Sequence, residues 1–262
     1  MIASRILLKQ KSFILDRTMN VLIYGKRKAF PVLVIPSQDG TAFDYEHFGM
    51  VGVLKPYLDK GLIQLFCIDS MDKASFSDTD GDPETRIQNQ EKYYRYVIEE
   101  VLPLIRHNCR FRSRILLTGN SMGGYHAANF FFRRPDLFEG FISLSGIFDA
   151  SLLMNGYMSS LVYLNSPIHS LENMQKDHPY VSIYKNRCIY LCVGRGKWEE
   201  EGLRTQPILT SLLEEKGIPV FSDYWGYDVN HDWCWWRKQI VYFMDMALKR
   251  IKIHYPTILR KV

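Results

Sequence analysis

Short apolar runs alternate with amphipathic segments along most of the chain. Continuous apolar runs such as 62–68 and 188–193 are typical of strands buried on both faces of a sheet. Segments with apolar residues at helical spacing lie between these runs, and the longest, 86–107, contains Pro103, which should kink it. Strands alternating with helices predict a mostly parallel central sheet with helices on both faces, an α/β fold.

The order of elements follows from the same pattern. It predicts strands at 5–15, 19–24, 31–35, 62–68, 114–118, 140–145, 188–193 and 220–224, and helices at 51–60, 86–107, 122–134, 204–216 and 233–251. The stretch 149–186 is rich in Met, Tyr, Asn and Pro and is the best candidate for an inserted lid or pocket wall. No repeat or linker divides the chain, so we expect one domain over 1–262.

Composition and charge limit the classes of binding partner and the cellular compartment that we expect. The net charge of +5 is small and the basic residues are scattered, which argues against nucleic-acid binding. No apolar stretch reaches the roughly 18 residues needed to span a bilayer, and the N-terminus lacks a signal-peptide core. Five cysteines without CxxC spacing indicate a reducing compartment, so a cytoplasmic enzyme is expected, with homo-oligomerisation left open.

The strongest chemical signal is a G-x-S-x-G motif around Ser121, at 119–123, between a predicted strand and a predicted helix. Such a tight turn exposes a serine hydroxyl at a helix N-terminus, and the flanking glycines keep other side chains away from it. A chance match of common residues is the alternative, and the strand before and helix after favour a catalytic serine.

A serine hydroxyl needs a base, and His231 is the histidine best placed to supply one. It follows the last predicted strand and precedes the last predicted helix, so its loop should lie over the carboxyl edge of the sheet. His126 comes five residues after Ser121 on the same predicted helix and is interpreted as a packed or surface histidine.

The third member of a triad should be an acid in the loop after strand 188–193, where it can orient the imidazole. The loop at 194–202 contains no aspartate but three consecutive glutamates, Glu199, Glu200 and Glu201. One of these three must therefore serve.

The chain resembles the putative-esterase family of the α/β-hydrolases, the group that includes esterase D-like enzymes and mycolyltransferases. The resemblance covers nearly the whole chain and rests on GNSMGGYHAA at 119–128, FGM at 48–50, DS at 69–70 and HDW at 231–233 before Trp236. Comparison with the mycolyltransferase acid loop implies Glu200 as the acid, with Glu199 second. The resemblance also implies an α/β-hydrolase three-layer sandwich that needs no cofactor or metal.

The family's chemistry is hydrolysis of a small-molecule ester through an acyl-serine, with an oxyanion hole of two backbone N–H groups. The resemblance assigns these to Met122 and to the loop after strand 31–35, where Pro36 has no N–H and Gln38 is the choice, with Ser37 beside it. Two interpretations remain open: acyl transfer to an alcohol by the same triad, and a catalytically inactive hydrolase fold that serves as a binding protein.

Overall fold

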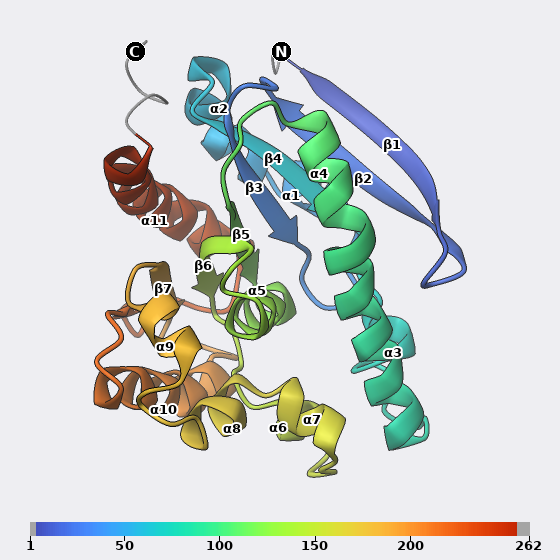
Figure 1. The fold of residues 1–262 in the computed structure, drawn as a ribbon, viewed down its shortest axis with the longest axis vertical. Helices are drawn as coiled ribbons and strands as arrows, with labels where there is room; N and C mark the ends of the chain where they lie inside the picture. The colour runs from blue at the N-terminus through green and yellow to red at the C-terminus, as the bar shows by residue number, and fades with distance from the viewer. Residues whose placement is uncertain (1–3, 256–262) are drawn as a thin grey trace.

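The central element of the fold is an eight-stranded sheet, seen in a computed structural model that describes residues 4–255 (Figure 1). Its strands are β1 (Arg5–Ser12), β2 (Arg17–Gly25), β3 (Phe30–Ile35), β4 (Ile63–Ile68), β5 (Ile115–Asn120), β6 (Phe138–Leu144), β7 (Cys188–Val193) and β8 (Phe221–Tyr224). Their order across the sheet is β1-β2-β4-β3-β5-β6-β7-β8. The first two pairings, β1 with β2 and β2 with β4, are antiparallel, and the others are parallel.

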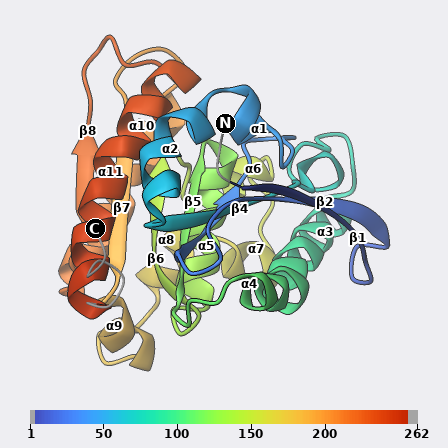
Figure 2. The ribbon, with the colours of Figure 1, turned by 90° about the horizontal axis from the view of Figure 1, so that it is seen from above.

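Helices cover both faces of this sheet (Figure 2). On one face lie α2 (Met50–Lys60) and α11 (Trp233–His254), preceded by the short α1 (Asp44–His47). On the other lie α3 (Pro83–Tyr96), α4 (Leu102–Asn108), α5 (Met122–Arg133) and α10 (Glu200–Glu215). The predicted α/β-hydrolase sandwich with a mostly parallel sheet is confirmed.

Two apolar cores fill the spaces between the layers, because successive side chains of each strand point to opposite faces. Leu33 of β3 faces the core under α3, α4 and α5, whereas Val34 faces the core under α2 and α11. β5 repeats this alternation with Leu117 and Leu116. The interior strands are buried along their whole length, which explains why their sequences read as continuous apolar runs.

Three predicted segments differ from the observed elements. The helix predicted at 86–107 is interrupted by a π-helical turn, Val97–Val101, directly before Leu102 and Pro103, because proline cannot donate the backbone hydrogen bond that a regular helix requires there. The helix predicted to begin at 204 begins at Glu200. The 149–186 stretch forms four short helices, α6 (Ala150–Leu153), α7 (Ser160–Leu164), α8 (Pro167–Glu172) and α9 (Pro179–Tyr184).

The five cysteines differ sharply in their access to solvent. Cys67, Cys109, Cys188 and Cys192 are buried, and burial raises the pKa of the Cys188 thiol to about 12. We therefore expect iodoacetamide to modify one thiol of the native protein, the exposed Cys234, and all five after denaturation, as counted by mass spectrometry. Rapid modification of a second thiol in the native protein would contradict this burial.

Within residues 4–255, no helix combines the length and apolar character that crossing a bilayer requires.

Candidate active site

The turn between β5 and α5 carries Ser121 in a strained conformation. Its φ of 56° and ψ of −126° lie outside the regions that side-chain-bearing residues favour. The Ser121 N–H donates to the Leu144 carbonyl at 2.8 Å, which fixes the turn to the end of the neighbouring strand β6. The hydroxyl thus stands at the N-terminus of α5, where the helix dipole favours negative charge.

Two glycines allow this turn to fit. A Cβ on Gly119 would collide with the Gly123 backbone, and a Cβ on Gly123 would collide with the carbonyl oxygens of Ile35 and Pro36. The start of α5 therefore packs directly against the loop that follows β3. Glycines at both positions of the motif are a packing requirement of this close approach.

We expect Gly123→Ala to lower the free energy of unfolding by about 1–3 kcal/mol, since backbone atoms on the β3 loop must move to admit the methyl group. Urea denaturation would measure this loss. Gly52→Ala is the matched control, because Gly52 lies in α2 and a methyl group added there would have no neighbour within 4 Å. That change should leave stability unchanged or raise it, as alanine favours helix. Equal stability of the two variants would exclude the close approach.

His231 lies in the loop between β8 and α11, and its Nδ1 is 3.1 Å from Glu199 Oε2. The His231 N–H donates to the Lys197 carbonyl at 3.0 Å, which joins its loop to the loop after β7. The next residue, Asp232, caps α11 by accepting from the Cys234 N–H, and this bond lowers the pKa of the Asp232 carboxyl. The cap fixes the start of α11 and thereby the position of His231 directly before it.

Glu199 is almost completely buried and its carboxylate is fully engaged. Besides His231, its Oε1 accepts from the Ser145 hydroxyl at 2.7 Å and from the Gly194 N–H at 3.3 Å. The Trp236 indole donates to Ser145 Oγ at 3.0 Å, and its ring packs edge-on against His231. A buried carboxylate with these donors is held in one orientation toward the imidazole.

The structure places Glu199, and not Glu200, beside His231, which changes the order of assignment derived from the family resemblance. Glu200 is exposed and begins α10, and among residues 4–255 it makes no hydrogen bond to His231. The cause is the turn before it, where Trp198 adopts a φ of 64° and directs the next side chain inward. Glu201, the third glutamate, pairs with Arg204 at 2.8 Å on the surface of α10.

Ser121, Glu199 and His231 follow the carboxyl ends of β5, β7 and β8, which belong to the parallel part of the sheet. Ser121 follows β5, its N–H binds the end of β6, and Ser145 just past β6 binds both the Cys192 carbonyl of β7 and Glu199. Because β5, β6, β7 and β8 are parallel, their carboxyl ends, and the groups that follow them, lie at one edge of the sheet. Within residues 4–255 the His231 ring bonds to Glu199, and no hydrogen bond joins it to Ser121 Oγ.

The loop after β3 lies beside the Ser121 turn. Asn120 Nδ2 donates to Ser37 Oγ at 2.9 Å, which holds this loop against the end of β5. Neither the Gln38 N–H nor the Met122 N–H has an acceptor within residues 4–255, so both are available to bind an oxygen anion. Gln38 is exposed and its side-chain amide donates to Ser77 Oγ at 2.9 Å.

Ser145 and Trp236 are site residues whose roles the sequence patterns did not identify. The residue pair Ser145-Gly146 after a buried strand is a weak signal, because serine and glycine commonly end strands. Trp236 belongs to the family resemblance, which assigned it no role. Their contacts with Glu199 and His231 span long sequence separations, which no local pattern encodes.

A groove of about 730 Å³ lies between β1 and α4 and is lined by none of Ser121, Glu199 and His231. Chemistry, and not cavity size, therefore locates the candidate site. Over residues 4–255, no cluster of three or more His, Cys, Asp and Glu side chains is arranged to hold a metal ion.

Comparison with known proteins agrees with this fold. The model of the family described as "Putative esterase" matches residues 12–244. No curated protein matches the sequence. Similar solved structures include a ferulic acid esterase (TM-score 0.72, 16% identity, covering 94% of this chain and 98% of that one). Another is an S-formylglutathione hydrolase from Agrobacterium tumefaciens (TM-score 0.70, 16% identity, covering 95% of this chain and 99% of that one).

A third similar structure is MPT51 (FbpC1) of Mycobacterium tuberculosis, with a TM-score of 0.73, 12% identity and coverage of 95% and 99%. Identities this low carry the fold alone, whereas the family match extends over most of the chain and confirms the resemblance drawn from the motifs. The chain therefore belongs to this esterase family and is an ester hydrolase of the α/β-hydrolase fold.

Proposed function

We propose that the enzyme hydrolyses carboxylic esters through an acyl-serine intermediate, with Ser121 as nucleophile, His231 as general base and Glu199 as the orienting acid. The observation that carries this proposal is the buried Glu199 carboxylate 3.1 Å from His231 Nδ1, at the same sheet edge as the strained Ser121 turn. An acid on Nδ1 keeps the proton there, so Nε2 remains free to accept one from a hydroxyl.

In the first half of the reaction, Ser121 Oγ forms a bond to the ester carbonyl carbon while His231 Nε2 takes the hydroxyl proton. The carbonyl oxygen becomes an anion, which the Met122 and Gln38 N–H groups would bind. The intermediate then collapses, the carbon–oxygen bond to the alcohol breaks, and His231 gives its proton to the departing alcohol.

In the second half, water repeats these steps against the acyl-serine. His231 takes a proton from water, the resulting hydroxide adds to the carbonyl carbon, and Ser121 leaves with the proton as the carboxylic acid is released. Throughout, the Glu199 carboxylate stabilises the imidazolium without itself accepting the proton. Each step uses only groups of this chain, the substrate and water.

We propose further that the chain forms one domain, with α6 and α7, the first part of the predicted 149–186 insertion, as a wall of the substrate pocket. In the last part, Tyr184 of α9 packs against Phe132 in the last turn of α5, away from Ser121. Figure 1 shows α6 and α7 at the end of the molecule toward which the β3 arrowhead points, the carboxyl edge of the sheet. Polar contacts support a fixed wall, because Asn165 accepts from Tyr125 of α5 at 2.7 Å and donates to Glu91 of α3 at 3.2 Å.

The first test is release of p-nitrophenol from short and medium acyl esters, together with labelling by a serine-directed fluorophosphonate. We expect turnover, and one phosphonyl group per chain on the peptide that contains Ser121. Added glycerol that diverts the acyl group from water would indicate acyl transfer by the same residues. A folded protein that neither turns over esters nor reacts with the fluorophosphonate would contradict the proposal and favour a binding protein.

A further inference from the structure

We infer that Asp72 and His126 form a positioning pair that holds the loop at 36–40, here called the oxyanion loop, in register with the nucleophile helix α5. This inference rests on the proposed function, in which Gln38 of that loop supplies an oxyanion donor. Neither residue has a step in the reaction itself. Both are completely buried, and a buried ionisable pair without a catalytic step requires another explanation.

The pair joins two elements that are distant in sequence. His126 Nε2 of α5 lies 3.0 Å from Asp72 Oδ1, which belongs to a short 3-10 helix, Asp72–Ala74, after β4. Gln90 Nε2 of α3 lies 3.4 Å from His126 Nδ1. With Nδ1 accepting from Gln90, the other nitrogen carries a proton and donates to Asp72.

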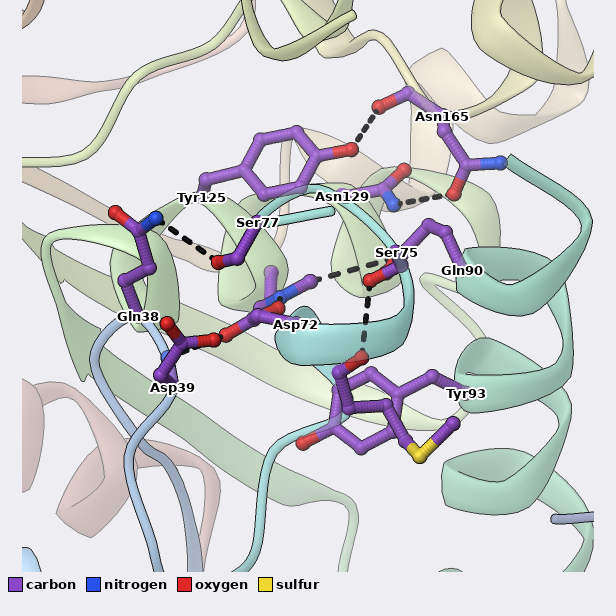
Figure 3. A network of polar contacts seen from close by, with 12 residues as sticks. Gln38, Asp39, Asp72, Ser75, Ser77, Gln90, Tyr93, Tyr125, Asn129 and Asn165 are labelled. Atoms are coloured by element: carbon purple, nitrogen blue, oxygen red, sulfur yellow. Dashed lines mark hydrogen bonds and ion pairs between the residues drawn. The ribbon is translucent and has the colours of Figure 1, made fainter. Parts of the chain in front are cut away.

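The second oxygen of Asp72 holds the oxyanion loop. Asp72 Oδ2 accepts from the Asp39 N–H at 3.2 Å, and Figure 3 shows the two aspartates facing one another. Asp39 has a φ of 57°, and the Gly40 N–H donates to the Ser37 carbonyl, so 37–40 is a turn with a left-handed third residue. That position favours glycine or asparagine, and the carboxylate on the Asp39 N–H stabilises the turn in spite of its strain.

The segment 72–77 thus holds both the side chain of Gln38 and the peptide that follows it. The Gln38 side-chain amide binds Ser77 Oγ, the Ser77 N–H binds the Asp72 carbonyl, and the following peptide binds the Asp72 carboxylate (Figure 3). His126 ties that segment to the helix whose first turn presents Ser121. The Asn120–Ser37 bond holds the start of the oxyanion loop, and the Asp72–His126 bond sets the position of its Gln38–Asp39 peptide relative to α5.

Aromatic rings enclose His126, since Phe76, Tyr93, Tyr125 and Phe130 all lie within 6.1 Å of its ring centroid. This surrounding makes His126→Phe a change of similar volume, which removes the donor to Asp72 and the acceptor for Gln90 Nε2. The double variant Asp72→Leu/His126→Phe replaces the whole pair by apolar side chains, which commonly restores stability lost when one partner is removed.

The experiment measures kcat per active site, with sites counted by the stoichiometry of fluorophosphonate labelling, and KM for the same ester. We expect both His126→Phe and the double variant to lose about tenfold to a hundredfold in kcat with KM within about twofold, because a displaced oxyanion donor acts mainly on the transition state. The melting temperature of the double variant should recover relative to His126→Phe while kcat should not.

A conservative variant that should keep the activity provides a second test. In Asp72→Asn the amide can donate to His126 Nε2 while its oxygen accepts from Asp39, provided that Gln90 turns its otherwise unpaired oxygen to His126 Nδ1. We expect kcat within about threefold of the wild type for this variant.

The matched control is His254→Phe, which breaks another His–carboxylate contact, His254 Nδ1 to buried Glu139 at 2.7 Å, at the start of β6. It should lower the melting temperature at most and leave kcat unchanged. The inference is overturned if either folded pair variant keeps the wild-type kcat per titrated site. A folded wild-type enzyme that neither turns over the ester nor reacts with the fluorophosphonate would instead refute the proposed function, so the two failures are distinguishable.

Discussion

Ser121→Ala should lower kcat by roughly 10⁴- to 10⁶-fold while the protein folds normally, because the loss of the nucleophile removes the covalent route entirely. Ser121 is half-buried, and its hydroxyl makes no hydrogen bond within residues 4–255, so its removal leaves no polar partner unsatisfied. The positive φ at this position is as strained for alanine as for serine. Initial rates with a p-nitrophenyl ester and the melting temperature would measure the two effects.

Two further variants sharpen that experiment. Ser121→Gly should be equally inactive but as stable as the wild type or more so, since glycine adopts positive φ without strain. Ser182→Ala, on the exposed surface of α9, should leave kcat and stability unchanged. If Ser121→Ala retained more than about a tenth of the wild-type rate, Ser121 would not be the nucleophile.

Much of the fold could be predicted from the pattern of apolar residues. Strands such as β7 are buried on both faces, so the run that predicts 188–193 coincides with the observed strand. Helix boundaries were less predictable. The observed α10 begins at Glu200, before the predicted start at 204, because its first three residues, Glu200, Glu201 and Gly202, contribute nothing to an apolar pattern. The four short helices within 149–186 lack the length that periodicity needs.

The candidate site was predictable where its chemistry is local in sequence. The G-x-S-x-G motif identifies Ser121 as a candidate from neighbours within three residues, and the elements around His231 indicate its loop. The partners of Glu199 and Asp72 could not be predicted in this way. Ser145 meets Glu199, and His126 meets Asp72, across 54 residues in each case, and only the assembled sheet and helices bring them together.

The choice between Glu199 and Glu200 shows how one backbone angle can decide a functional assignment. Three consecutive glutamates are equivalent as sequence letters, and counting from a shared glycine assumes a common loop shape. The positive φ of Trp198 alters that shape, so Glu199 turns into the core while Glu200 stays in solvent.

Glu199→Gln should lower kcat by about 10³- to 10⁴-fold, because an amide in place of the carboxylate favours the wrong histidine tautomer. Facing His231 Nδ1, the glutamine can donate its N–H there while its oxygen keeps the Ser145 and Gly194 bonds. The ring proton then resides on Nε2, which can no longer accept the proton of Ser121. The KM should change little, since Glu199 is buried and cannot touch substrate.

Glu200→Gln is the matched control, one residue away and identical in chemistry. Its side chain is exposed in the first turn of α10, where a negative charge stabilises the helix by about 0.3–1 kcal/mol, so stability should fall slightly and kcat should stay within about twofold. A large loss of kcat in Glu200→Gln, with Glu199→Gln active, would return the acid to the position implied by the mycolyltransferase-like loop. Equal activity of both variants would mean that His231 needs no carboxylate partner, and the proposed triad would reduce to a serine–histidine pair.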